Sequence, residues 1–268
     1  MSRTIRVDSP AGVAAALESP LLAPPPPPPS LKSGATADLR AAMARFSHGR
    51  PHKKRRRDVV SLIEGFDPSR IEAAARDRTG VLLRGGEIKA VAAFAAVVPT
   101  EVLAGAAGVS AGEIESLVDD VERIARVIGR GEPSSDASDA AAERIMTRFT
   151  GHQAGPVPVA SLLYQNCDAT AALTAVTIQS HYSGVPRRPA ISSTTRFAIG
   201  DTDLEGTAIP KGTTLELDLE QTGFEFGSGT HQCPGQELAQ AIVGGVIRAL
   251  DDARHILDKS RWLYYLNA

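Results

Sequence analysis

Cysteine, aromatic residues and net charge are all scarce in this sequence. The two cysteines, Cys167 and Cys233, lie far apart and have no set of histidines beside them, which excludes a disulfide framework and argues against a zinc cluster. A formal net charge of −2 gives no global field that would attract nucleic acid. No apolar run is long enough to cross a bilayer, and no signal peptide is found. We therefore expect a soluble, cytoplasmic protein with neither a nucleic-acid nor a membrane partner.

The composition and the hydrophobic pattern favour a mainly α protein with a small β-element. Aromatic residues are 4% of the chain and alanine is abundant, which suits helices that meet through small side chains. Apolar periodicity predicts a single domain over residues 1–268. Helices are expected over 11–17, 37–46, 49–63, 68–83, 90–107 with a new helix starting at Pro99, 112–128, 138–149, 158–180 and 236–250. Strands are expected over 4–7 and within 194–219.

Residues 24–29 are six consecutive prolines, which favour extended polyproline II structure. Such a run is compatible with a domain linker, a ligand for a proline-recognition module or a stiff surface loop within one domain. No change of composition separates its two flanks, so the sequence favours the loop.

The chain is organised around residues 226–235, FGSGTHQCPG, which carry a cysteine near their end. A cysteine thiolate is an axial ligand for haem iron, and the glycines of this stretch allow a backbone that approaches a flat cofactor closely. A helix with apolar residues spaced by four follows directly, and its N-terminus favours a negative charge such as a thiolate. The structural alternative is a glycine-rich turn around a buried cysteine.

This stretch resembles the haem-binding signature of the cytochromes P450, F-x-x-G-x-H-x-C-x-G. The matched positions are Phe226, Gly229, His231, Cys233 and Gly235. The resemblance implies a cytochrome P450-like fold that binds haem b (iron-protoporphyrin IX) with Cys233 as the ligand of the metal. A thiolate ligand favours O–O cleavage by increasing the electron density at iron.

A basic run at 53–57 has three interpretations: a solvated helix face, a nucleic-acid contact, or a site for the two haem propionates. The segment resembles the family pattern H-x-x-x-R at His52 and Arg56, which lie on one face of a helix. Arg196 lies in a stretch that resembles the family's R-x-x-x-x-D-x-x-x-x-G-x-x-I-P-x-G-T pattern. The resemblance implies that His52, Arg56 and Arg196 converge with His231 on the two propionates, which require cationic partners when partly buried.

The predicted long helix over 158–180 resembles the family's I helix, which crosses the distal face of the haem. The family pattern there is A/G-G-x-D/E-T. Aligning its acid with Asp168 places Gln165 at one of the small residues and Ala169 where the oxygen-activating threonine normally lies. We therefore assign Asp168, Gln165 and Ala169 to the catalytic region, and we expect weak proton delivery from a methyl group.

Two family segments are missing, so the chain resembles a shortened, truncated member. Asp168 lies 28 positions before Arg196 with no E-x-x-R between them, and Leu219 lies 7 positions before Phe226, which leaves no room for the usual meander. The first hypothesis is a haem-dependent monooxygenase of a small organic molecule, served by a ferredoxin and ferredoxin reductase. The alternatives are a peroxide-dependent or redox-neutral haem-thiolate enzyme and a non-catalytic haem-binding relic.

Overall fold

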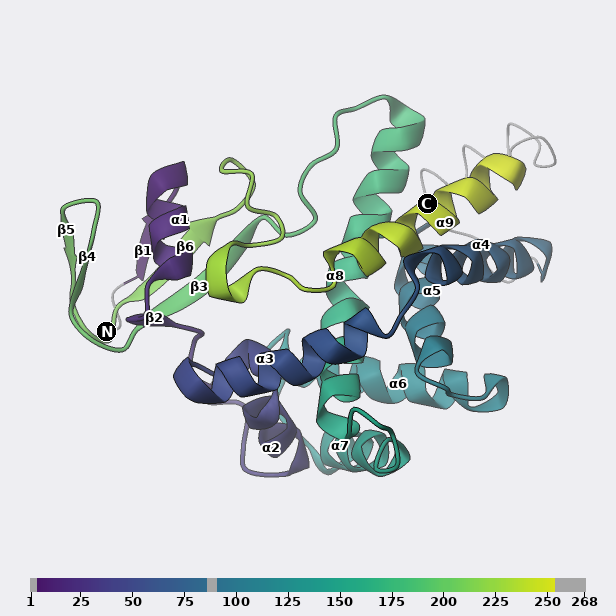
Figure 1. Cartoon of the computed structure of the whole chain (residues 1–268), viewed down its shortest axis with the longest axis horizontal. Coiled ribbons are helices and arrows are strands. Elements are labelled where there is room, and N and C mark those ends of the chain that lie inside the picture. The colour runs from purple at the N-terminus through teal and green to yellow at the C-terminus, as the bar shows by residue number, and fades with distance from the viewer. Residues whose placement is uncertain (1–3, 86–90, 254–268) are drawn as a thin grey trace.

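The computed structural model describes residues 4–85 and 91–253 (Figure 1). The helices of these ranges are α1 (Pro10–Glu18), α2 (Ala35–Ala42), η1 (Ala44–Phe46), α3 (Gly49–Glu64), α4 (Pro68–Gly85), α5 (Val91–Ala106), α6 (Ala111–Ile128), α7 (Asp136–Arg148), α8 (Pro156–Ser183), η2 (Gly229–His231) and α9 (Gln236–Ala253). The strands are β1 (Thr4–Val7), β2 (Leu22–Ala23), β3 (Ser193–Ala198), β4 (Thr202–Leu204), β5 (Thr207–Ile209) and β6 (Thr214–Asp218). The predicted mainly α fold with a small β-element is confirmed.

The long helix α8 runs through the helical part of the molecule and contacts α3, α5, α6, α7 and α9 (Figure 1). Helices α4 and α9 lie side by side. A Cβ atom at Gly245 would be 2.2 Å from the carbonyl oxygen of Glu72, so glycine is required for this close approach. The predicted apolar stripe of α9 is buried in the helical core, at Leu238, Ile242, Val246 and Leu250. None of the helices in the described ranges is long and apolar enough to span a membrane.

A four-stranded sheet of order β1-β6-β3-β2 forms the other part of the described structure. Strand β1 is parallel to β6, whereas β3 is antiparallel to both β6 and β2. Helix α1 packs on this sheet and supplies Val13, Ala16 and Leu17 to a second hydrophobic cluster. Strands β4 and β5 form a separate hairpin, whose turn residues Glu205 and Gly206 both have positive φ.

Two predicted helix boundaries are wrong. Helix α5 continues through Pro99, where a new helix was expected. This is possible because an interior proline removes one hydrogen bond and can be accommodated with a kink. The helix expected over 37–46 ends at Ala42, and the separate 3₁₀ turn η1 follows after Met43 adopts an extended backbone.

The polyproline run at 24–29 is an irregular segment between the sheet and the helices. Arg40 of α2 donates a hydrogen bond from Nη2 to the carbonyl oxygen of Pro25 (3.1 Å). Just after the run, Ser30 Oγ donates to the carbonyl oxygen of Gly131, and the backbone of Ser134 donates to that of Ser30. These contacts tie the segment to α2 and to the connection between α6 and α7.

Candidate functional site

The cysteine-containing loop lies between the sheet and α9, and its own backbone holds its shape. The N–H of Cys233 donates to the carbonyl oxygen of Phe226 (2.8 Å), and the N–H of Gly227 donates to that of Phe224 (2.7 Å). Gly227 and Gly229 have φ values of 70° and 61°, which L side chains rarely adopt. These bonds and angles close a compact loop that ends at the start of α9.

Glycine is needed at Gly229 for a second reason. A Cβ atom there would be 2.7 Å from Cγ of Glu18, at the end of α1. A Cβ atom at Gly235 would make only an ordinary contact, 3.8 Å from Cδ1 of Ile63. Glu18 of α1 therefore lies against the loop at Gly229, whereas Ile63 of α3 lies at ordinary contact distance from Gly235.

The two thiols have different surroundings. Cys233 is exposed, although protein atoms around it at longer range raise its pKa by desolvation; the N–H of Gly235 and the charges of Arg45 and Arg56 act in the opposite direction. Cys167 is buried in α8, where desolvation raises the pKa of its thiol to about 11. Because the thiolate is the form that binds metals, Cys233 is the better candidate ligand.

The structure brings His52 of α3 and His231 of η2 together. Their rings stack with centroids 4.1 Å apart and an angle of 29° between planes. Burial, together with the neighbouring His52 and Arg196, lowers the pKa of His231 to about 3. The pKa of His52 is lowered by burial and then by Arg56. Both imidazoles are therefore neutral at pH 7.

Arg196 of β3 is a buried guanidinium that meets no anionic side chain within the described ranges. Its side chain is 7% exposed, its Nε has no hydrogen-bond partner in the described residues, and its Nη1 donates to the carbonyl oxygen of Thr195 (3.0 Å). Burial, followed by repulsion from Arg45, lowers its pKa to about 10. Among the described residues, none of the group Arg196, Arg56, His52 and His231 forms an ion pair with an acidic side chain.

We call these four residues, His52, Arg56, Arg196 and His231, the cation cluster. A buried charge normally has a partner, so the cluster is incomplete without an anionic group. Haem would provide what is missing here: its two propionates are carboxylates that could pair with the cation cluster, and its iron could bind the thiolate of Cys233. The residues present therefore fit the cofactor that the loop signature implies.

Two neighbours of the cation cluster were missed by the sequence analysis. Arg45 of η1 influences the pKa of both Cys233 and Arg196 through its charge. His48 lies four positions before His52, and its charge lowers the pKa of both His52 and His231. The spacing of four between His48 and His52 is the signal that could have indicated it.

The three residues predicted for the distal side make other contacts. Gln165 donates from Nε2 back to the carbonyl oxygen (3.2 Å) and Oγ (3.0 Å) of Ser161, one turn earlier in α8. Asp168 accepts from Nη2 (2.6 Å) and Nε (3.4 Å) of Arg130. Ala169 is half-buried. Among the described residues, no hydrogen bond or ion pair joins these three side chains to the Cys233 loop.

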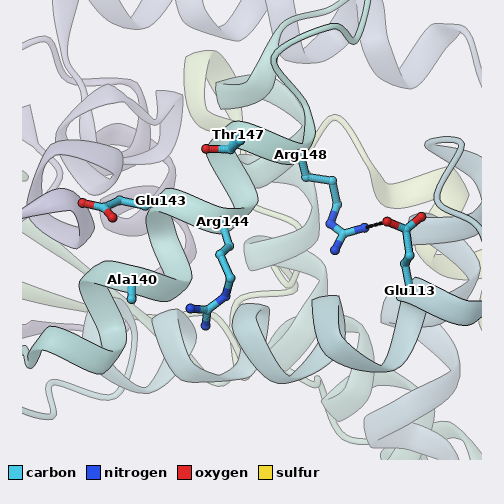
Figure 2. A pocket seen from close by; sticks show the side chains of 6 residues that line it. All are labelled: Glu113, Ala140, Glu143, Arg144, Thr147 and Arg148. Atoms are coloured by element: carbon cyan, nitrogen blue, oxygen red, sulfur yellow. Dashed lines mark hydrogen bonds and ion pairs between the residues drawn. The ribbon is translucent and has the colours of Figure 1, made fainter.

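A surface hollow of about 580 Å³ lies elsewhere, between α6 and α7 (Figure 2). Its two arginines are both paired: Arg148 with Glu113 (2.7 Å) and Arg144 with Asp120 (2.5 Å). Both arginine charges are therefore already neutralised, and among the described residues the exposed carboxylate of Glu143 is the charged lining group without an ion pair. We assign the hollow no chemistry.

Comparison with solved structures relates this arrangement to known proteins. P450BioI, solved in complex with hexadec-9Z-enoic acid ligated acyl carrier protein, superimposes with a TM-score of 0.72 at 18% sequence identity, covering 92% of this chain and 85% of that one. An unusual cytochrome P450-like monooxygenase involved in microbial secondary metabolism gives 0.69 at 14% identity, covering 95% and 87%. CYP109E1 from Bacillus megaterium, solved with corticosterone, gives 0.69 at 14%, covering 92% and 83%.

No protein-family model matches the sequence, and no curated protein matches it. At these identities the structural likeness establishes the fold alone. The chain has a cytochrome P450-like fold in a shortened form, as the loop signature implied.

Proposed function

We propose that this protein is a haem-thiolate oxidoreductase of the cytochrome P450 type that acts on a small organic molecule. The observation that carries the proposal is the position of Cys233 beside the cation cluster, whose buried Arg196 has no anionic partner among the described residues. Haem b supplies both the missing carboxylates and an iron for the thiolate, and its chemistry when bound is the activation of oxygen or peroxide. We further propose that residues 1–268 form one haem-binding domain.

In this proposal Cys233 is the proximal ligand, and three neighbours oppose the rise in its pKa that burial causes. The Gly235 N–H donates a hydrogen bond toward the sulfur, and Arg45 and Arg56 add positive charge. Phe226 contributes the carbonyl that holds the Cys233 backbone, and Gly229 allows the tight passage beside α1. These features orient the thiolate and lower its pKa against the effect of burial.

The cation cluster would hold the two propionates. Arg196 and Arg56 supply permanent charge, because an arginine stays protonated at pH 7 even when burial lowers its pKa to about 10. His52 and His231 are neutral without an anion and can donate one N–H each. Carboxylates nearby would raise the pKa of both imidazoles and strengthen these bonds.

The distal residues favour a chemistry that needs little proton delivery. Ala169 has no proton to give, Gln165 is hydrogen-bonded within its own helix, and Asp168 is held by Arg130. We therefore keep a second candidate function, a haem-thiolate enzyme that uses peroxide or rearranges or dehydrates its substrate without a reductase. A non-catalytic haem-binding module is the third candidate. The retention of the whole cation cluster beside Cys233 speaks against it.

Two further parts of the proposal concern partners and location. Exposed basic residues of α3, such as Lys53 and Arg57, offer a surface of positive charge to an acidic redox partner of the ferredoxin type. A cytoplasmic location is the second part of the proposal.

A haem titration of the purified protein tests the proposal. We expect one equivalent to bind and the ferrous–CO complex to show the red-shifted Soret band of thiolate ligation. Cys233→Ser should abolish that band, whereas Cys167→Ser should keep it, because the Cys167 thiol is buried in α8. If both variants keep the band, or both lose it, Cys233 is not the ligand. Turnover with peroxide, compared with turnover by a surrogate ferredoxin system, then separates the first two candidate functions.

A further inference from the structure

One ion pair joins the Cys233 loop to the segment between α8 and β3. Arg187 of that segment donates from Nη1 to Oε1 and from Nη2 to Oε2 of Glu225, each at 2.7 Å. The backbone N–H of Ala190 donates to the same Oε1 at 2.6 Å. Both oxygens of Glu225 are thus engaged by three donors, and its side chain is only 11% exposed.

Glu225 is adjacent in sequence to the residue that holds the Cys233 backbone. Its neighbour Phe226 accepts the N–H of Cys233, and Phe224 on its other side accepts the N–H of Gly227. A displacement of Glu225 would therefore move both carbonyl oxygens on which the closed loop depends. The pair is 38 positions apart in sequence, so it fixes the start of the loop against a distant part of the chain.

We propose that the Arg187–Glu225 pair is a positioning device for the proximal ligand. It takes the place of the E-x-x-R motif, which in the cytochromes P450 ties the proximal side together and which is absent between Asp168 and Arg196. Arg187 lies in the short connection between α8 and β3, the part of the chain in which no E-x-x-R motif occurs. The planar guanidinium binds both carboxylate oxygens at once and thereby fixes orientation as well as distance. This inference deepens the proposed function and rests on it where Cys233 is called the proximal ligand.

The geometry supports an anchoring role more than an ordinary surface ion pair. Exposed pairs contribute little because water solvates both partners, whereas Glu225 is almost fully enclosed and also accepts a backbone N–H. The pKa of Glu225 is lowered, first by the hydrogen bond from Arg187, while burial acts in the opposite direction. The Arg144–Asp120 pair has similar bidentate geometry but joins α7 to α6, and it provides a matched control.

Amide hydrogen exchange at Cys233 tests the inference without haem. In the apoprotein, Glu225→Gln and Arg187→Gln should each accelerate exchange of the Cys233 N–H about fivefold to tenfold, and the double variant should add little to either single change. The charge-swapped protein, Arg187→Glu with Glu225→Arg, should recover part of the protection. Arg144→Gln should leave exchange at Cys233 unchanged.

A second measurement uses the haem-loaded protein. The quantity to measure is the ratio of ferrous–CO complex with the thiolate band to complex without it. This ratio should fall about fivefold in Glu225→Gln and should stay at the wild-type value in Arg144→Gln. If Glu225→Gln does not fold, Arg187→Lys tests the same ion pair. Lysine keeps a positive charge near the enclosed Glu225 carboxylate, which is 11% exposed, but it cannot bind both carboxylate oxygens at once.

Two results would overturn the inference. The first is a Cys233 N–H exchange rate within twofold of wild type in both Glu225→Gln and Arg187→Gln. The second is an equal acceleration in Arg144→Gln, which would indicate a general loss of stability. These outcomes are separate from failure of the proposed function. A wild-type protein that binds haem without a thiolate band would refute Cys233 as the ligand, and the exchange data would still decide whether the pair holds the loop.

Discussion

Replacing Arg196 by methionine should stabilise the apoprotein and weaken haem binding at the same time. The guanidinium is 7% exposed and lacks an anionic partner in the described part of the chain, and burial lowers its pKa from the ordinary arginine value to about 10. Such a fall corresponds to a penalty of about 3 kcal/mol for the buried charge, at about 1.4 kcal/mol for each factor of ten in the protonation equilibrium. Methionine has a similar shape and no charge, so it removes this penalty.

The two effects have different magnitudes. We expect the free energy of unfolding of the apoprotein to rise by about 1–3 kcal/mol, because the hydrogen bond to Thr195 is lost along with the penalty. Charge-assisted hydrogen bonds contribute about 1.5–3 kcal/mol, so loss of the propionate contact should weaken haem affinity about 10-fold to 150-fold.

Urea unfolding of the apoprotein and competitive haem transfer to a second apoprotein measure the two quantities. Arg57→Met is the control, since Arg57 is exposed on the basic helix α3 and has no hydrogen bond or ion pair among the described residues. Both quantities should stay at wild-type values there. If Arg196→Met destabilises the apoprotein, or if it retains haem as well as wild type does, Arg196 is not a binding residue for a propionate.

Two further predictions concern pH and catalysis. The pKa of His231 is lowered to about 3, so the unfolded chain binds this proton below about pH 6.5 while the folded apoprotein does not. The free energy of unfolding should therefore fall as the pH drops from 6.5 toward 4, by at most about 1.4 kcal/mol per pH unit from this group. His231→Phe should flatten that part of the curve, and an unchanged slope would contradict the prediction. Ala169→Thr should raise the fraction of electrons recovered in product with a surrogate ferredoxin system, measured as product formed per NADPH consumed; tight coupling in the wild-type protein would contradict it.

Local patterns in the sequence predicted the parts of the fold that depend on local physics. The spacing of Leu238, Ile242, Val246 and Leu250 predicted the buried face of α9, and all four side chains are buried. A spacing of four predicts both the helix and the face of it that is buried. The meeting of His52 with His231 followed from the family resemblance, and the stacked rings bring both into one cluster.

Other contacts could not be predicted, because they join residues far apart in sequence. Nothing around Asp168 indicates that Arg130 will hold it, since the partner comes from the end of a different helix. A partner close in sequence was missed as well: Ser161 lies one turn before Gln165, which the resemblance assigned to the catalytic region, and its hydroxyl and carbonyl oxygens accept from the Gln165 amide. Propensity predicted a break at Pro99, and packing of α5 against α8 overrode it.

The parallel pairing of β1 with β6 has a consequence for the order of folding. Thr4 aligns with Thr214, and Arg6 reaches Asp218, so residues that leave the ribosome early wait for partners made 210 positions later. Closing a loop of that length costs about 5 kcal/mol of chain entropy beyond a constant term. Helices that follow one another along the chain, such as α5 with α6 and α6 with α7, contact across much shorter separations and can form first. The sheet that carries Arg196 should therefore assemble late, when the loop that bears Cys233 has also been made, so that both parts of the cofactor site are completed in the same final stage of folding.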